Sequence, residues 1–79
     1  MQDVKYALIR ARDSMKYLAH KKDYVIHALI AYTKADKPKH YHSFALYYMR
    51  TALLSDTLKS CQFAIEQAVD AVEKEEAKN

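Results

Sequence analysis

Apolar residues recur along the first part of the chain at alternating intervals of three and four. The series runs through Val4, Leu8, Ala11, Met15, Leu18, Lys22, Val25, Leu29 and Tyr32. This spacing places its members on one side of an α-helix, with Lys22 as the charged exception. No strong helix breaker interrupts the series, so the pattern predicts one helix over about residues 3–34.

The segment around Pro38 is the clearest interruption in the chain. Proline disfavours a helical conformation at the residue before it and suits the first turn of a new helix. Beyond Pro38, a second series with the same spacing runs through His40, Phe44, Tyr47, Thr51, Leu54, Leu58, Cys61, Ile65, Ala68 and Val72. We therefore expect a turn over residues 35–38 and a second helix over about residues 39–75.

Two long helices joined by a short turn form an antiparallel hairpin, so the sequence predicts an all-α fold with one helical domain over residues 1–79. The hairpin alone leaves apolar positions beside both series uncovered, among them Ile26 and Met49. A second copy would cover them, and a homodimeric four-helix bundle is therefore expected. The alternative is a three-helix monomer, in which the second helix breaks at Ser55-Asp56 and one of these residues caps a new helix.

The two apolar series supply a candidate interface for a partner. Burying them in a helical seam removes apolar surface from water, which drives association. The candidate interface residues are Leu8, Met15, Leu18, Val25, Leu29, Phe44, Tyr47, Leu54, Leu58, Ile65 and Val72. The sequence thus favours a non-enzymatic helical protein–protein interaction or adaptor module, whose partner is a second copy of the chain or another protein.

Composition narrows the class of protein. The chain has no glycine and one proline, which removes the usual means of making the tight turns of a multi-strand fold. The single cysteine, Cys61, excludes an internal disulfide, and no N-terminal leader or apolar run of about 18 residues occurs. A cytoplasmic location without membrane contact is the default expectation. Because no glycine-rich phosphate loop or nucleophile motif is present, neither catalysis nor a cofactor is expected.

Charge is distributed unevenly along the chain. Residues 1–59 carry eleven Lys or Arg against five Asp or Glu, whereas residues 60–79 carry two against five. The basic body, residues 5–50, and the seven tyrosines suggest an alternative function, nucleic-acid binding through phosphate contacts and base stacking. This alternative requires one continuous face for its basic residues, which are Arg10, Arg12, Lys16, Lys21 and Arg50.

Lysines and histidines gather around the expected turn: Lys34, Lys37, Lys39, His40 and His42. Cations run against the usual preference for acidic residues at a helix N-terminus, because the free amides there already present positive charge. These residues define a candidate anion-receptive tip. The alternative is a solvated turn in which lysine serves solubility.

Three residues in the first helix have a spacing compatible with metal binding. His20, Asp23 and His27 are three and four residues apart, so they project from the same side of the helix. Imidazole and carboxylate are ligands for zinc and other transition metals, and another helix would have to complete the site. The alternative is a set of surface hydrogen bonds that includes an Asp23–His27 pair. The spacing leaves both open, and no metal is assigned.

Overall fold

The computed structural model describes residues 2–14, 17–34 and 42–77. They form four helices, α1 (Gln2–Asp13), α2 (Leu18–Lys34), α3 (His42–Leu54) and α4 (Leu58–Ala77). Within these ranges there is no strand, so the all-α prediction is confirmed. None of the helices in the described ranges is both long and apolar enough to cross a membrane. The expected turn at residues 35–38 lies outside the described residues.

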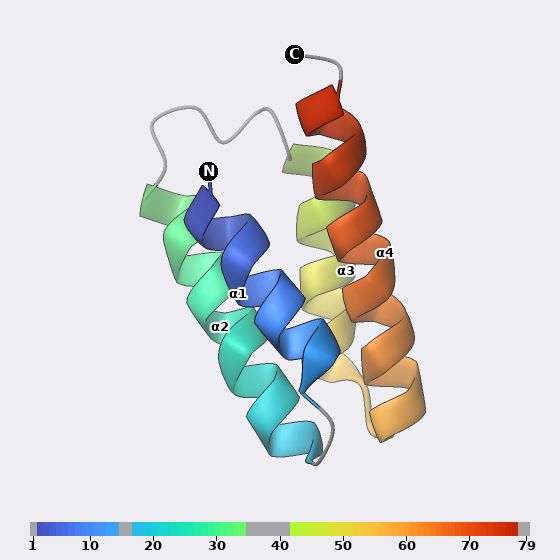
Figure 1. Ribbon diagram of the computed structural model, residues 1–79. Coiled ribbons are helices and arrows are strands. Elements are labelled where there is room, and N and C mark those ends of the chain that lie inside the picture. The colour runs from blue at the N-terminus through green and yellow to red at the C-terminus, as the bar shows by residue number, and fades with distance from the viewer. Residues whose placement is uncertain (1, 15–16, 35–41, 78–79) are drawn as a thin grey trace.

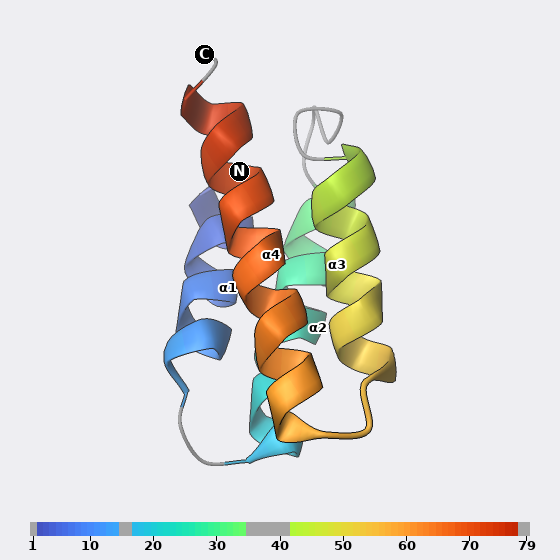
Figure 2. The same ribbon diagram turned by 90° about the vertical axis from the view of Figure 1, so that its right-hand side faces the viewer.

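Successive helices run in opposite directions around a common core (Figure 1). α1 and α2 pack along each other as one pair, and α3 and α4 pack as a second pair. Turning the molecule shows α4 in front, with α1 and α3 on either side of it and α2 behind (Figure 2). The resulting body measures 33 × 20 × 19 Å, which is short compared with the 45 Å or so that a 30-residue helix would span.

The prediction of two unbroken helices, about 3–34 and 39–75, is wrong. Each expected helix is divided in two, so four helices come from one chain and share one core. The apolar flanks explain why this arrangement is favourable. Met49, which a two-helix hairpin would leave uncovered, is fully buried here without a second copy.

The first division lies between α1 and α2, and the sequence reasoning missed it. α1 ends where the Ser14 amide donates to the carbonyl oxygens of Arg10 and Ala11, at 3.0 and 3.3 Å. α2 starts with the Lys21 amide donating to the Tyr17 carbonyl oxygen at 3.1 Å. No glycine or proline lies at this point of the sequence. Polar groups from neighbouring helices instead bind the free carbonyls at the end of α1 and stabilise it there.

The second division is the one that the three-helix alternative placed at Ser55-Asp56, and its position is confirmed. The Ser55 hydroxyl donates to the Thr51 carbonyl oxygen at 2.8 Å, which gives the end of α3 a local side-chain partner. The cap of α4 is neither Ser55 nor Asp56. The Thr57 hydroxyl accepts the Ser60 amide at 3.1 Å, so Thr57 is the N-cap.

Buried side chains from all four helices form the core. They include Val4, Leu8 and Ala11 of α1, Val25, Ala28 and Tyr32 of α2, Ala45, Met49 and Ala52 of α3, and Cys61, Ile65, Ala68 and Val72 of α4. The predicted series is therefore buried along α4 from Cys61 onward, whereas Leu58 at the start of the helix is exposed. In α3 it is not, because the division at Ser55 lets α3 adopt its own rotation about its axis, and Ala45, Met49 and Ala52 face inward instead.

Candidate functional site

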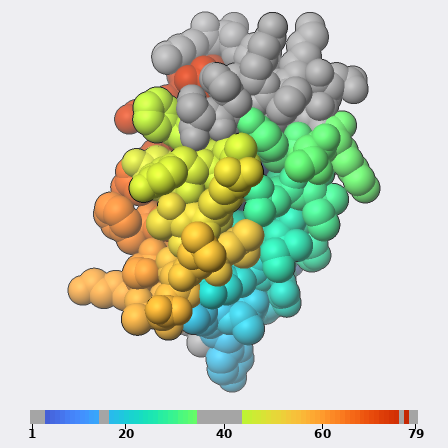
Figure 3. Space-filling view, turned by 180° about the vertical axis from the view of Figure 1, so that it is seen from behind, coloured from blue at the N-terminus to red at the C-terminus, as the bar shows by residue number. Residues whose placement is uncertain are grey.

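The outer side of α3 carries large apolar side chains in contact with solvent. Phe44, Tyr47 and Leu54 expose 68%, 62% and 81% of their surface. Their spacing of three and seven residues places them along one side of the helix. We call these three residues the α3 face. The space-filling view in Figure 3 looks onto the side of the molecule where α3, in yellow, lies beside α2, in green and cyan.

Helix α3 carries large apolar side chains on both its inner and its outer side, with Arg50 and Thr51 as exposed polar residues of the outer side. Its inner side is buried through Ala45, Met49 and Ala52, and among its thirteen residues Arg50 is the only Lys, Arg, Asp or Glu. A surface helix normally carries charged side chains opposite its buried stripe. The Tyr47 and Tyr48 rings also meet edge to face, with their centroids 5.2 Å apart and their planes at 73°. The α3 face is therefore an exposed apolar surface in which Tyr47 packs against a neighbouring ring.

The candidate interface residues divide into three groups. Leu8, Val25, Ile65 and Val72 are buried inside the single chain, and Leu18 and Leu29 are half-buried. Phe44, Tyr47, Leu54 and Leu58 are exposed, whereas Met15 lies outside the described residues. The buried members are thus occupied within one chain, and the exposed members are the ones still available to a partner.

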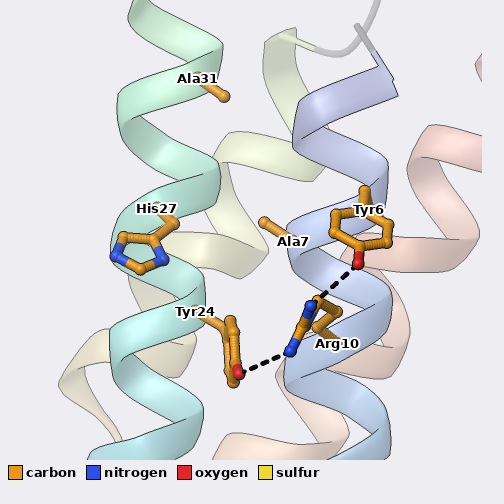
Figure 4. Close-up of a pocket in the computed structure, with 6 residues that line it drawn as sticks. All are labelled: Tyr6, Ala7, Arg10, Tyr24, His27 and Ala31. Carbon is orange, nitrogen blue, oxygen red and sulfur yellow. Dashed lines mark hydrogen bonds between the residues drawn. The ribbon is translucent and has the colours of Figure 1, made fainter.

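A second feature links α1 and α2 on another part of the surface. The Arg10 guanidinium donates hydrogen bonds to the hydroxyl oxygens of Tyr6, at 2.9 Å, and Tyr24, at 3.2 Å. It also lies 5.4 and 5.2 Å from the centroids of the same two rings. Figure 4 shows the guanidinium between the two hydroxyls, at the side of an open hollow. We call Tyr6, Arg10 and Tyr24 the arginine–tyrosine clamp.

Arg10 is charged and exposed in the clamp. The hydrogen bonds from Tyr6 and Tyr24 raise the pKa of Arg10, because each hydroxyl oxygen stabilises the protonated guanidinium. Arg12 differs, since its Nε donates to Asp13 Oδ1 at 3.0 Å and forms an ion pair. Among the described contacts of Arg10 there is no carboxylate. The clamp thus holds a positive charge that hydroxyls orient and no acid neutralises.

His20 and His27, whose spacing is compatible with metal binding, lie on either side of Tyr24. The His20 ring is 5.2 Å from the Tyr24 ring, and the His27 ring meets Tyr24 edge-on at 6.1 Å. The described residues contain no group of three or more His, Cys, Asp or Glu side chains that could hold a metal ion. His20 instead approaches the Ser14 hydroxyl, with Nδ1 and Oγ 3.5 Å apart.

Lys21 is buried, with 3% of its surface exposed, although its sequence context suggested a basic surface. Its ammonium donates to the carbonyl oxygens of Ala11 and Arg12, at 2.9 and 3.2 Å. Burial lowers the pKa of Lys21, and nearby Cys61, Asp13 and Glu66 oppose this shift. Of the basic residues named for nucleic-acid binding, Lys21 is therefore not part of an exposed face, and Lys16 lies outside the described residues.

The end of α1 also meets α4. The Gln62 side-chain amide donates to the Arg12 carbonyl oxygen and to Glu66 Oε2, both at 3.0 Å. Next to it, Cys61 is fully buried, and burial raises the pKa of its thiol. A buried, protonated thiol is a poor nucleophile, which agrees with a packing role for Cys61.

Most of the anion-receptive tip lies outside the described residues. Lys34 is exposed at the end of α2, and His42 is the first residue of α3. Lys37, Lys39 and His40 belong to the part of the chain that is not described. The tip therefore stays a prediction.

The arginine–tyrosine clamp was not predicted from the sequence. Tyr6 and Arg10 are four residues apart, so their contact along one helix was open to prediction. Tyr24 is fourteen residues from Arg10, and its contact depends on the division between α1 and α2. Without that division, Tyr24 would lie about 20 Å along the same helix from Arg10.

Comparisons with known proteins give no match: no protein-family model, curated protein or solved structure matches the chain. The functional proposals below depend on the contacts, burial and charge of the described residues.

Proposed function

We propose that the protein is a helical protein–protein interaction module that self-associates through the α3 face. One observation carries the proposal: opposite its buried side, α3 exposes three large apolar side chains, Phe44, Tyr47 and Leu54, and Arg50 is the only Lys, Arg, Asp or Glu of this helix. Covering such an exposed apolar stripe removes it from water and stabilises the assembly. Phe44, Tyr47 and Leu54 are the side chains that a partner would cover.

A second copy is a suitable occupant of this face. A two-fold symmetric dimer places the same patch on both sides of the interface, so the patch must tolerate meeting itself. Phe44, Tyr47 and Leu54 are uncharged, and Arg50, which is exposed beside them, would have to lie at the rim of such an interface. The chain carries a net charge of +3, so an interface formed by its basic parts would bring like charges from the two copies together and would be less favourable.

Energy considerations point to a modest affinity. Burying a fully exposed large apolar side chain contributes about 1.5–3 kcal/mol, and a symmetric dimer buries each of the three residues twice. Association itself costs on the order of 4–15 kcal/mol in lost freedom. The two contributions are of similar size, so self-association should depend on protein concentration.

The experiment compares two matched phenylalanines. Phe44 on α3 and Phe63 on α4 have similar exposed fractions, 68% and 61%. Sedimentation equilibrium at tens of micromolar should give twice the 9.2 kDa chain mass for the unmodified protein and for Phe63→Lys. Phe44→Lys should give the monomer mass. An unmodified protein that stays monomeric, or equal dissociation by both variants, contradicts the proposal.

A further inference from the structure

The hollow beside the clamp has a defined lining. It is open to solvent and has a volume of about 310 Å³, and it is lined by Tyr6, Ala7 and Arg10 of α1 and Tyr24, His27 and Ala31 of α2 (Figure 4). The two alanines and the tyrosine rings are apolar. The guanidinium and the two hydroxyls form one polar group, and the His27 imidazole is a separate polar group of the lining. The hollow therefore has a charged end and an apolar wall.

The polar groups of this hollow are mainly hydrogen-bond donors. Each tyrosine hydroxyl accepts a bond from Arg10, so its own hydrogen remains available for donation. A guanidinium has five N–H donors, and two bonds leave three of them for a ligand. The lining contains no Asp or Glu that would accept hydrogen bonds from these donors. An acceptor-rich, negatively charged group is what such a set of donors binds.

The contrast between Arg10 and Arg12 supports this assignment. Both arginines lie near the end of α1, but Arg12 is already paired with Asp13. Arg10 instead contacts two neutral hydroxyls and the rings that carry them. Because Tyr6 and Tyr24 orient the guanidinium before any ligand arrives, an anion does not have to order a free arginine side chain.

We propose that the hollow binds a small organic anion, whose carboxylate or phosphate head contacts Arg10, Tyr6 and Tyr24 and whose apolar body lies against Ala7, Ala31 and the tyrosine rings. Carboxylate and phosphate are the groups that a guanidinium fork recognises best. A volume of 310 Å³ is at the small end for ligand pockets, which limits the body to about one ring. The hollow is open to solvent, so binding is on the order of millimolar.

This site is separate from the α3 face, because it lies between α1 and α2. Failure of one proposal therefore leaves the other standing. The oligomeric state tests the α3 face, and ligand titration tests the hollow.

The experiment is an NMR titration with phenyl phosphate, benzoate and inorganic phosphate. Phenyl phosphate or benzoate at millimolar concentration should shift the side-chain resonances of Arg10 and the ring resonances of Tyr6 and Tyr24 in a saturable way. Comparison of the two organic anions identifies the preferred head group. Inorganic phosphate should bind more weakly than phenyl phosphate, because it lacks the apolar body.

Variants locate the binding. Arg10→Gln should weaken binding of the preferred anion by about tenfold or more, because a charge-assisted pair is lost. Tyr24→Phe keeps the ring but removes one hydroxyl, and it should weaken binding of the anion severalfold. Arg50→Gln makes the same charge change at an exposed residue of α3 and should leave binding unchanged. The proposal is overturned if neither organic anion produces saturable shifts at the clamp, or if Arg10→Gln and Arg50→Gln weaken binding equally.

Discussion

The ammonium of Lys21 lies 2.9 Å from the carbonyl oxygen of Ala11, so a residue near the start of α2 caps the last turn of α1. The same ammonium reaches the Arg12 carbonyl oxygen at 3.2 Å. The last carbonyls of a helix have no partner within it, and they carry partial negative charge that a cation stabilises. One buried lysine thus stabilises the division that turns one predicted helix into two.

Replacing Lys21 by methionine should destabilise the protein. Lys21→Met keeps most of the apolar stem but removes the donor that both carbonyl oxygens share. Because the Gln62 side chain still donates to the Arg12 oxygen and the Ser14 amide to the Ala11 oxygen, the expected loss is about 1 kcal/mol in the free energy of unfolding. Urea denaturation followed by circular dichroism measures the change. The matched control is Lys22→Met, since Lys22 is the adjacent residue and is only half-buried. This control should lose clearly less free energy of unfolding than Lys21→Met. Equal losses would mean that the Lys21 cap contributes nothing specific.

The start of α4 depends on Thr57. Thr57→Ala removes the hydroxyl that accepts the Ser60 amide, and N-cap losses of this kind cost about 1 kcal/mol. Thr57→Ser, which keeps the acceptor, should restore most of the free energy of unfolding. If Thr57→Ala and Thr57→Ser denature at the same urea concentration, Thr57 does not act as a cap.

In α3 the buried residues are not those of the second predicted series, and only part of the physical reason can be read from the sequence. A stripe of Phe44, Tyr47 and Leu54 and a stripe of Ala45, Met49 and Ala52 both satisfy helical spacing. The first stripe carries the two aromatic rings, which favours it as core, yet the four closely packed helices bury the second stripe, which contains two alanines. Which stripe faces inward is decided by the neighbouring helices, and they come from distant parts of the chain.

More of α4 could be predicted, because it carries one apolar stripe and its other side is charged. Its buried residues include Cys61, Ile65, Ala68 and Val72, as the series indicates. The division at Ser55 was also accessible, since serine side chains bind nearby backbone groups and compete with helix. The arginine–tyrosine clamp and the inward turn of Lys21 were not, because both depend on contacts across the unpredicted division between α1 and α2.

The two sides of α3 should respond oppositely to charge. Met49→Lys places an ammonium in a fully buried position without a partner, which should cost about 3 kcal/mol or more and unfold much of the protein. Phe44→Lys should leave the far-ultraviolet circular dichroism spectrum native, because Phe44 is exposed within the single chain. Loss of helical signal in Phe44→Lys, with Met49→Lys intact, would reverse the assignment of the inner and outer sides.

Cys61 should make stability depend on pH in the alkaline range. Burial raises the pKa of its thiol in the folded chain above the usual 9.0, and nearby Lys22 and Lys21 lower it less. A group whose pKa is raised by folding stabilises the fold fully below about pH 9, and this contribution is lost as the pH rises further. The free energy of unfolding should therefore fall between pH 7.5 and 9.5.

The measurement is urea denaturation at both pH values under reducing conditions, for the unmodified protein and Cys61→Ala. The alanine variant should be less stable at pH 7.5, because a buried side chain is shortened. Its stability should fall less between the two pH values, because it lacks the thiol. If both proteins lose the same free energy between pH 7.5 and 9.5, Cys61 does not resist ionisation in the fold.

The central proposal, self-association through the α3 face, is tested most directly by detecting contacts between copies. Isotope-labelled and unlabelled chains are mixed in equal amounts, and an isotope-filtered nuclear Overhauser experiment records only contacts between different copies. We expect intermolecular contacts from the Phe44 and Tyr47 rings and the Leu54 methyl groups, and none from Phe63. Absence of any intermolecular contact at millimolar protein, or contacts confined to Phe63 and α4, would contradict the proposal.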